Sequence, residues 1–289
     1  MQTNLRFYSV LEALLGRRFL MRTGRFLFLG ARRELVNTPS VNGEYALIRA
    51  IAAYMIKQPE TSPHVCFDVG CHLGDWTAQL LGEAKHAQLV IYPFEPAPAQ
   101  YDHIATRLAG PIAAGQVKMQ RVALAAESGT TEFFVTGDDS GDNAIATANP
   151  DAHGERITVA LDTIDQFCAK HGIETLTLVK VDTEGNDFNV IAGASEMLAA
   201  GRIGVLQFEY NWRWVAFGHM LRMVFKAIEG LDYHVAQITG TGLEVHDEWH
   251  PELERFSETN FALVRTDMLA RLSHRRLRFD NANTLVVAV

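Results

Sequence analysis

The sequence predicts an α/β fold in which a doubly wound, mostly parallel sheet carries helices on both faces. Short apolar runs alternate along the chain with segments whose apolar residues recur at helical spacing. Several of these runs are continuous stretches of Val, Ile, Leu and Phe, as in strands buried on both faces of a parallel sheet. Short connections between them favour a doubly wound arrangement. A chain of 289 residues can form one such domain with additions.

The elements follow in order along the chain. A helix is expected over residues 44–56, because EYALIRAIAAYMI has helical spacing and QPETSP ends it. Strands are expected at 65–69, 89–94, 117–121, 131–135, 176–182 and 205–209. Helices are expected at 76–83, 97–109, 161–171, 187–199 and 218–230. Two late strands, in GLDYHVAQI and TNFALVRT, are expected to form an antiparallel hairpin at the sheet edge.

Composition excludes several classes of protein. The formal net charge of −8 argues against general nucleic-acid binding. No apolar run approaches the roughly 20 residues of a membrane span, and the first residues lack the order of a signal peptide. Three cysteines without a CxxC pair argue against a disulfide framework and a zinc knuckle. The expected partner is a small molecule, and the expected location is the cytoplasm.

The N-terminal region differs from the rest of the chain. RRFLMRTGRFLFLGARREL alternates arginines with Phe and Leu, which makes a basic amphipathic segment. We expect a helical cap or extension over residues 1–57 and the main α/β domain over 58–289. The segment caps the main domain, completes a homodimer or contacts a membrane surface peripherally, and the sequence leaves these alternatives open.

The stretch VCFDVGCHLGDWT predicts a ligand site where a strand turns into a helix. Gly70 allows a sharp turn and Gly74 lets the helix start close to the strand or ligand. A dinucleotide-binding pattern would have glycines where this chain has His72 and Asp75. Asp75 also places an acid where a phosphate would bind a helix N-terminus. Together with Asp68, it favours a ligand with a cationic centre.

The next strand ends in VIYPFEPAP, which places an acid at its carboxyl end. Glu95 follows Gly74 by 21 positions and suits hydrogen bonding to the 2′- and 3′-hydroxyls of a ribose. A glycine turn with a ribose-binding acid predicts a nucleoside, and the acids at the turn argue against a pyrophosphate. S-adenosylmethionine satisfies both conditions.

Five ordered segments of the sequence resemble the FkbM family of S-adenosylmethionine-dependent methyltransferases. They fall within about residues 65–209 and are FDVGCHLGDWT, YPFEPAP, VALAAESGTTEFFV, ITVALDTIDQF and LTLVKVDTEGNDFNVIAGASEML. TNFALV extends the similarity towards the C-terminus. The resemblance implies a class I methyltransferase fold with a Rossmann-like, seven-stranded sheet. It also implies O-methylation of a small molecule, such as a sugar or natural-product hydroxyl.

The resemblance assigns cofactor-binding roles to individual positions. Asp68, Gly70 and Gly74 match the family's first motif, and Glu95 matches its ribose-binding acid. The small residue and asparagine that usually follow the first glycine are replaced by two others, which we expect to line the cofactor pocket: Cys71 and His72. The segment DDSGDNAIAT resembles a family loop, and two of its residues are expected near the adenine: Asp142 and Asn143.

The segment LVKVDTEGN predicts the catalytic groups. Asp182 ends a strand and is expected to face the cofactor methyl, where it would accept the proton of the substrate hydroxyl. Lys180 shares its face of the strand, because alternate residues point the same way. His219 follows a Trp-rich segment and is expected to reach the site from a lid.

A divalent metal is an alternative role for the same acids. Asp182, Glu209 and Asn211 would lie at neighbouring strand ends and offer oxygen ligands suited to Mg²⁺. By analogy with other class I O-methyltransferases, such an ion would acidify the acceptor hydroxyl; otherwise these groups bind the acceptor directly. Two further function classes stay open, a nicotinamide-dependent oxidoreductase and a noncatalytic scaffold on the same fold.

Overall fold

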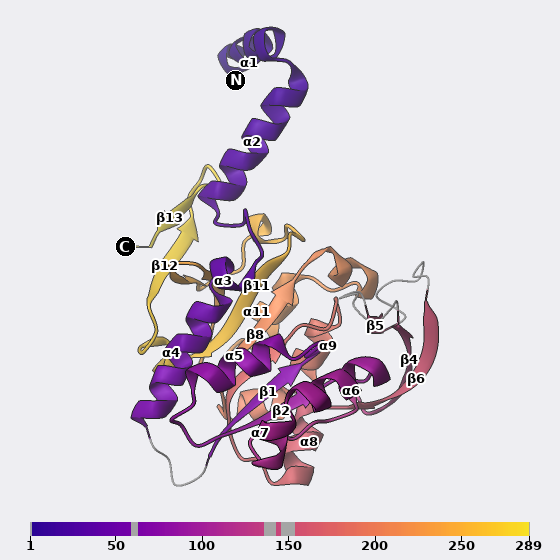
Figure 1. Ribbon diagram of the computed structural model, residues 1–289. Coiled ribbons are helices and arrows are strands. Elements are labelled where there is room, and N and C mark those ends of the chain that lie inside the picture. The colour runs from indigo at the N-terminus through magenta and orange to yellow at the C-terminus, as the bar shows by residue number, and fades with distance from the viewer. Residues whose placement is uncertain (1, 59–62, 136–142, 146–153, 289) are drawn as a thin grey trace.

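The computed structural model describes residues 2–58, 63–135, 143–145 and 154–288, and it contains a nine-stranded sheet (Figure 1). The strand order is β13-β12-β10-β9-β11-β8-β7-β1-β2. In chain order the strands are β1 (His64–Val69), β2 (Leu89–Phe94), β7 (Leu176–Val181), β8 (Ile203–Tyr210), β9 (Tyr233–Thr239), β10 (Gly242–His246), β11 (Thr259–Arg265), β12 (His274–Phe279) and β13 (Leu285–Val287).

The sheet is mixed, which corrects the prediction of a mostly parallel, seven-stranded sheet. β2, β1, β7 and β8 run parallel, whereas β11 pairs antiparallel with both β8 and β9. The predicted late hairpin therefore forms, but it lies inside the sheet. The loop and tail around it supply β10, β12 and β13, which pair beyond β9 and extend the edge.

A smaller sheet lies beside the carboxyl end of β2. It has the order β3-β6-β4-β5, and its strands are β3 (Ala123–Leu124), β4 (Gly129–Val135), β5 (Ala144–Ile145) and β6 (Glu155–Asp162). β6 occupies the beginning of the predicted helix 161–171, so that helix is shorter than expected. Its start is set by the Thr163 side chain, which accepts a hydrogen bond from the Gln166 amide.

Helices cover both faces of the large sheet, as predicted. α4 (Glu44–Lys57) and α5 (Asp75–Glu83) pack on one face, against side chains such as Cys66 and Leu178. The opposite face, which includes Phe67 and Val179, is covered by α8 (Ile164–His171), α9 (Asp187–Ala192), α10 (Ser195–Ala199) and α11 (Leu221–Ala227). Neighbouring residues of each buried strand face opposite layers, which explains their continuous apolar sequences.

Residues 117–121 do not form the predicted strand. They run beside β2 but form only two isolated bridges, Ile91 with Val117 and Phe94 with Gln120. Pro93 lies between those bridges in β2 and has no N–H to donate, which interrupts the ladder. Two helices, α6 (Pro98–Arg107) and α7 (Ala109–Ala113), connect β2 to this segment.

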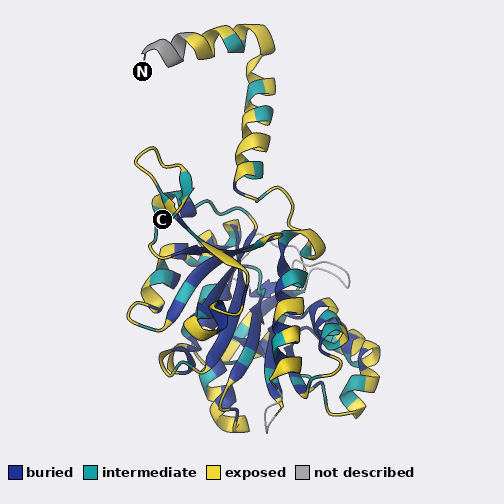
Figure 2. Cartoon of the chain, turned by 90° about the vertical axis from the view of Figure 1, so that its left-hand side faces the viewer, coloured by how far each residue is buried: buried dark blue, intermediate teal, exposed yellow. Residues whose placement is uncertain are grey.

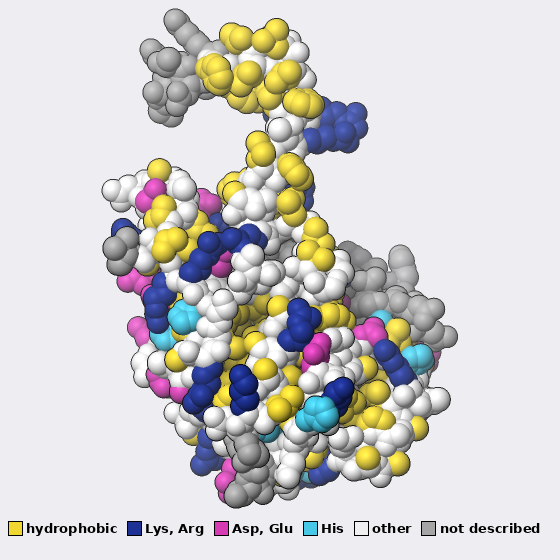
Figure 3. Space-filling model, turned by 60° about the vertical axis from the view of Figure 1, so that its left-hand side comes forward, with side chains coloured by type: hydrophobic (Ala, Val, Ile, Leu, Met, Phe, Trp, Pro, Cys, Tyr) yellow, Lys and Arg dark blue, Asp and Glu magenta, His cyan; other side chains and the backbone are white. Residues whose placement is uncertain are grey.

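The N-terminal region has two parts. α3 (Pro39–Asn42) and α4 lie on the main body, and α4 buries Leu47, Ile48 and Ile51 in its core. α1 (Gln2–Leu15) and α2 (Arg17–Ala31) instead stand away from the body as an arm that is largely exposed (Figures 1, 2 and 3). In the part of the chain that the structure describes, no helix has both the length and the apolar character to cross a membrane.

Candidate functional site

The turn between β1 and α5 is held against the end of β2. The N–H groups of Gly70 and Cys71 both donate to the Phe94 carbonyl, at 3.1 and 3.2 Å. Gly70, His72 and Gly74 all have positive φ, at 75°, 47° and 78°. This backbone conformation explains the two glycines, because residues with side chains seldom adopt it.

We expect Gly70→Ala to destabilise the protein. The added methyl group would collide with the Asp182 carbonyl oxygen, and alanine at φ 75° costs about 1–2 kcal/mol before that collision. A matched control is Gly82→Ala in α5, where an added Cβ meets nothing within 4 Å and should stabilise the helix slightly. Thermal denaturation of both variants tests this, and equal melting temperatures would contradict it.

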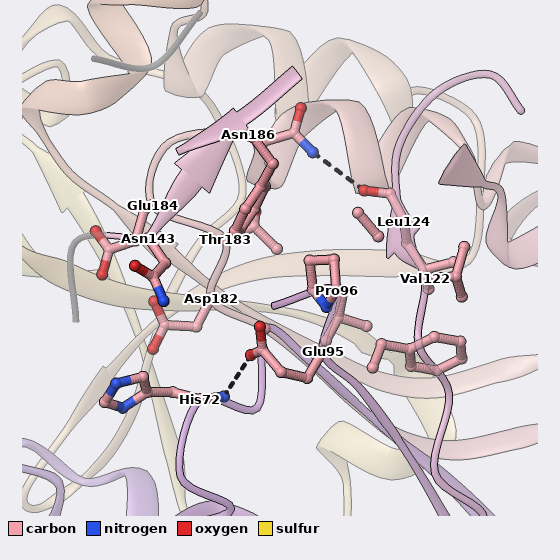
Figure 4. Close-up of a pocket in the computed structure, with 15 residues that line it drawn as sticks. His72, Glu95, Pro96, Val122, Leu124, Asn143, Asp182, Thr183, Glu184 and Asn186 are labelled. Atoms are coloured by element: carbon pink, nitrogen blue, oxygen red, sulfur yellow. Dashed lines mark hydrogen bonds between the residues drawn. The ribbon is translucent and has the colours of Figure 1, made fainter. Parts of the chain in front are cut away.

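A first cavity of about 270 Å³ opens at the carboxyl ends of β1, β2 and β7 (Figure 4). The side chains that line it change from apolar at one end to polar and charged at the other. Val122 and Leu124 form an apolar end, Glu95 and Pro96 lie centrally, and His72, Asp182 and Asn143 gather at a polar end. The cavity can therefore take a ligand with an apolar ring at one end and a charged or polar group at the other.

Glu95 is buried at the centre of this cavity, with 4% of its surface exposed. Its carboxylate oxygens accept hydrogen bonds from the backbone N–H groups of His72 and Ala97, each at 3.0 Å. These two contacts fix the orientation of the side chain. Burial raises the pKa of Glu95 to about 7, although both backbone N–H groups oppose that rise.

The turn after β7 forms the polar end. Glu184 has φ 55° and Gly185 φ 102°, and the Arg213 side chain packs over this turn. Arg213 Nη1 lies 2.8 Å from Glu184 Oε2, so an ion pair holds this turn against the segment after β8. Asn186 donates to the Leu124 carbonyl at 3.1 Å and so joins the turn to the apolar end of the cavity (Figure 4).

Lys180 is buried between two carboxylates. Its Nζ lies 3.1 Å from Asp182 Oδ2 and 3.9 Å from Asp68 Oδ1. Asp68 is fully buried and also accepts a 2.6 Å hydrogen bond from the Thr77 hydroxyl. Burial opposes the charge of Lys180, but Asp182 and Asp68 outweigh it and raise the pKa of the lysine. Lys180 is therefore a cation that orients Asp182, and it is unsuited to accept a proton.

A second cavity, of about 220 Å³, adjoins the first. Both cavities are lined by Gly70, His72 and Asp182, so these residues form the wall between them. The second cavity is also lined by Cys71, Lys180 and Glu209, and by residues from the N-terminal segment and β11: Asn37, Pro39, Glu44, Tyr45 and Asn260. Cys71 was expected in the cofactor pocket, but it lines the second cavity and not the first. Burial raises the pKa of its thiol well above the usual range, which argues against a thiolate nucleophile.

Side-chain amides surround the two glutamates of the second cavity. Glu209 accepts hydrogen bonds from Asn37 at 2.9 Å and from Asn211 at 2.7 Å. Glu44 accepts from the amides of three residues, at 2.7 to 3.2 Å: Asn42, Gln207 and Asn260. Asn260 and Glu209 are directly opposite in the β11–β8 ladder, which brings the two networks together.

Sequence reasoning missed the residues that the N-terminal segment and β11 contribute. The segment NTPSVNGEY carried a usable signal of a polar turn. It places two asparagines and a glutamate close to Pro39 and Gly43, two helix-breaking residues, just before an apolar helix. Nothing in the local sequence indicated that this turn would meet β8, because Asn37 and Glu209 are 172 positions apart.

The structure brings together most of the predicted residues and separates a few. Four lie outside both cavities: Asp68, Gly74, Asn211 and His219. Gly74 faces Ile104 of α6, where an added Cβ would lie at 3.2 Å. The His219 ring stacks on Phe217 and meets Phe188 edge-on, so it is held in an aromatic cluster and does not serve as a lid. Asn143 lies at the polar end of the first cavity beside Asp182, and not at the apolar end that would suit the adenine, where the sequence had placed it (Figure 4). Asp142 lies outside the described residues.

The predicted metal ligands do not fit an ion. Asn211 is fully buried, its oxygen accepts the Arg213 N–H at 2.9 Å, and its amide nitrogen faces Glu209. An amide nitrogen that donates to a carboxylate cannot ligate a cation at that point. Among the described residues, no three His, Cys, Asp or Glu side chains are grouped to hold a metal ion.

The first cavity fits a nucleoside cofactor with a cationic centre. The glycine turn lets a ligand approach the backbone. Glu95 lies beside this turn, and each of its carboxylate oxygens has a further lone pair that can accept a hydrogen bond from the ligand. His72 Nε2 is buried and has no hydrogen-bond partner among the described residues, so it is available to a ligand. The acids at the polar end suit a positive charge.

A curated protein is similar to part of this chain. The chain is 26% identical to the 2-O-methyltransferase NoeI of Sinorhizobium fredii (strain NBRC 101917 / NGR234) over 151 residues, which are 48% of this chain and 60% of that protein. It therefore spans about 60% of the length of this curated relative.

Among solved structures, the chain is similar to a methyltransferase FkbM from Methylobacillus flagellatus KT, with 13% identity and a TM-score of 0.46 over 84% of this chain and 59% of the other. It is also similar to a precorrin-6y C5,15-methyltransferase from Geobacter metallireducens GS-15, with 12% identity and a TM-score of 0.37 over 75% and 87%. The model of the methyltransferase FkbM domain matches residues 68–235, more than half of the sequence, and the chain belongs to the FkbM methyltransferase family.

Proposed function

We propose that this chain is an S-adenosylmethionine-dependent O-methyltransferase that acts on a hydroxyl of a sugar or other small natural-product molecule. The main support for the proposal is the order in which apolar, hydrogen-bonding and acidic side chains line the first cavity. Its apolar end suits an adenine, Glu95 suits the ribose, and the end at Asp182 suits the sulfonium. Family membership supports the cofactor, and the similarity to a 2-O-methyltransferase supports a hydroxyl acceptor.

The second cavity is the proposed acceptor site. Its carboxylates and amides offer many hydrogen-bonding groups close together, which suits a polyhydroxylated ligand. Tyr45 adds an aromatic ring to the same wall. Because Asp182 belongs to both cavities, an acceptor hydroxyl bound there would lie beside the cofactor's reactive end.

The protein's main task in this reaction is alignment and removal of one proton. When bound, S-adenosylmethionine supplies an electrophilic methyl group on a good leaving group. Asp182 would accept the hydroxyl proton, and Lys180 would hold the Asp182 side chain in place at 3.1 Å. Asn37, Asn260 and Glu209 would fix the acceptor by hydrogen bonds.

The proposal is tested by calorimetry with S-adenosylhomocysteine and NAD⁺, followed by assays with a panel of saccharides and phenols. We expect micromolar binding of S-adenosylhomocysteine, no binding of NAD⁺, and acceptor-dependent release of S-adenosylhomocysteine from S-adenosylmethionine. Binding of NAD⁺ alone would favour an oxidoreductase. If neither S-adenosylhomocysteine nor NAD⁺ binds, a noncatalytic scaffold is favoured.

Cofactor affinity should fall as the pH decreases through about 7. Ionised Glu95 accepts two ribose hydroxyls, whereas its protonated form does so less well, and burial raises its pKa to about 7. We expect the Kd for S-adenosylhomocysteine to rise by up to about tenfold per pH unit below that value. The fold itself is not weakened by this group. A raised carboxyl pKa means that the folded state binds more protons than the unfolded state, so acidification favours folding in this range.

Glu95→Gln is the control for this pH dependence. It should bind more weakly and without the inflection near pH 7. An unchanged inflection in the variant would assign it to another group, such as Glu209, whose pKa burial also raises to about 7.

A further inference from the structure

The N-terminal arm, formed by α1 and α2, exposes an unusual amount of apolar surface (Figure 3). None of the residues of α2 is buried. The exposed fractions reach 75% at Leu14, 64% at Met21 and 62% at Leu27. Ten of the eighteen exposed large hydrophobic side chains among the described residues belong to this arm. Contiguous apolar surface of this kind marks a region that another surface covers.

α2 sorts its side chains by type. Arg18, Arg22 and Arg25 are spaced by four and three residues, which places them on one side of the helix. Phe19 and Phe26 are seven positions apart and lie together next to that side. Arginines beside an apolar face can keep their charged ends in a polar layer while the rings enter an apolar one.

Charge favours an anionic partner for the arm. Residues 1–31 contain five arginines and one glutamate, a formal charge of +4. The net charge of the whole chain is −8, so the other 258 residues together carry −12. Two arms would repel one another if they paired. The acidic body of a second copy offers little apolar surface in return, since beyond Val41 the exposed large hydrophobics of the described chain are Ile56, Trp212, Val215, Met220 and Val287.

We propose that the arm docks on a lipid surface with anionic phosphate head groups, with α2 lying in the plane of the interface. Guanidinium groups bind phosphates through paired hydrogen bonds, and the adjacent Phe and Leu side chains would enter the acyl boundary. α2 is 15 residues, or about 22 Å, long and lies along the surface instead of crossing it. This proposal does not depend on the reaction that the chain catalyses.

The base of the arm is attached to the body near the second cavity. Glu34 lies 2.8 Å from Arg32 and 3.1 Å from Arg255. The guanidinium groups of both arginines also lie over the Phe28 ring, at 5.8 and 4.3 Å. Three residues after Glu34, Asn37 lines the second cavity. A docked arm would therefore hold that cavity close to the lipid surface, where an acceptor with a lipid anchor could reach it.

Co-sedimentation of the full chain with vesicles tests the proposal. The vesicles are phosphatidylcholine alone and phosphatidylcholine mixed with phosphatidylglycerol, each at low and high salt. We expect binding to the anionic vesicles that weakens with salt. Phe19→Ser/Phe26→Ser and Arg18→Glu/Arg22→Glu should each lower the partition coefficient by about tenfold or more. Lys85→Glu/Arg202→Glu makes the same charge change at exposed sites on the body and should leave binding within about twofold.

Melting temperatures equal to that of the wild type would show that the arm variants are folded. The proposal is overturned if the wild type does not bind anionic vesicles, or if the arm and body variants lose binding equally. It is also overturned if light scattering finds a dimer that Phe19→Ser/Phe26→Ser converts to monomer, because the surface then belongs to a second copy.

Discussion

Replacing Glu95 by alanine should lower the affinity for S-adenosylhomocysteine by about 100-fold or more. The change removes two hydrogen bonds from ribose hydroxyls to a charged acceptor, and each such bond contributes about 1.5–3 kcal/mol. It also leaves the N–H groups of His72 and Ala97 without their acceptor, so the turn itself should lose order. Calorimetric titration of the wild type and the variant measures the effect.

Asp102→Ala is a matched control for that titration. Asp102 is an exposed acid on α6, the helix that follows Glu95, and its removal should leave the affinity unchanged. If Glu95→Ala bound the ligand as tightly as the wild type, the nucleoside would lie elsewhere and the proposed order of the first cavity would be wrong.

Replacing Asp182 by asparagine should lower kcat by about 10²- to 10⁴-fold, the range expected when a general base is lost. The two side chains have nearly the same shape, and the asparagine oxygen can still face Lys180. The Kd for S-adenosylhomocysteine should therefore change little. Steady-state kinetics with the acceptor found by the panel, together with calorimetry, separate the two quantities.

Glu209→Gln gives the comparison that identifies the base. Glu209 lines the second cavity with Asp182 but is already bonded to two amides, so its replacement should raise the acceptor KM more than it lowers kcat. A larger loss of kcat in Glu209→Gln than in Asp182→Asn would assign the proton to Glu209 and contradict the proposed mechanism.

The residues around the proposed nucleoside site could be placed from the sequence because their signals are local. Gly70 and Gly74 are needed for the backbone to turn within a few residues, and Glu95 follows at the end of the adjacent strand. Parallel pairing of β1 and β2 then brings these positions together without further information. The same reasoning placed Asp182 beside them, because β7 pairs with β1.

Other predictions failed where packing between distant segments decided the outcome. His219 had the right chemistry for a catalytic group, but its ring packs against Phe217 and Phe188 and lines neither cavity. Asn211 offered an oxygen as a metal ligand, but that oxygen already accepts a hydrogen bond from the backbone N–H of Arg213. The sheet gained β10, β12 and β13 because segments between and after the two predicted late strands pair into it, and no strand had been expected there.

The sequence by itself determined the α/β class, the positions of β1, β2 and the glycine turn, and the acid beside them. These depend on φ preferences and apolar periodicity within a few neighbouring residues. Only the tertiary structure decided that Asn37, Glu44 and Asn260 form one wall with Glu209, and that α2 stands clear of the body. Such contacts join residues up to 223 positions apart. They arise because α4 buries its apolar face against the sheet, and because β11 pairs with β8 so that Asn260 lies opposite Glu209 at the carboxyl end of β8.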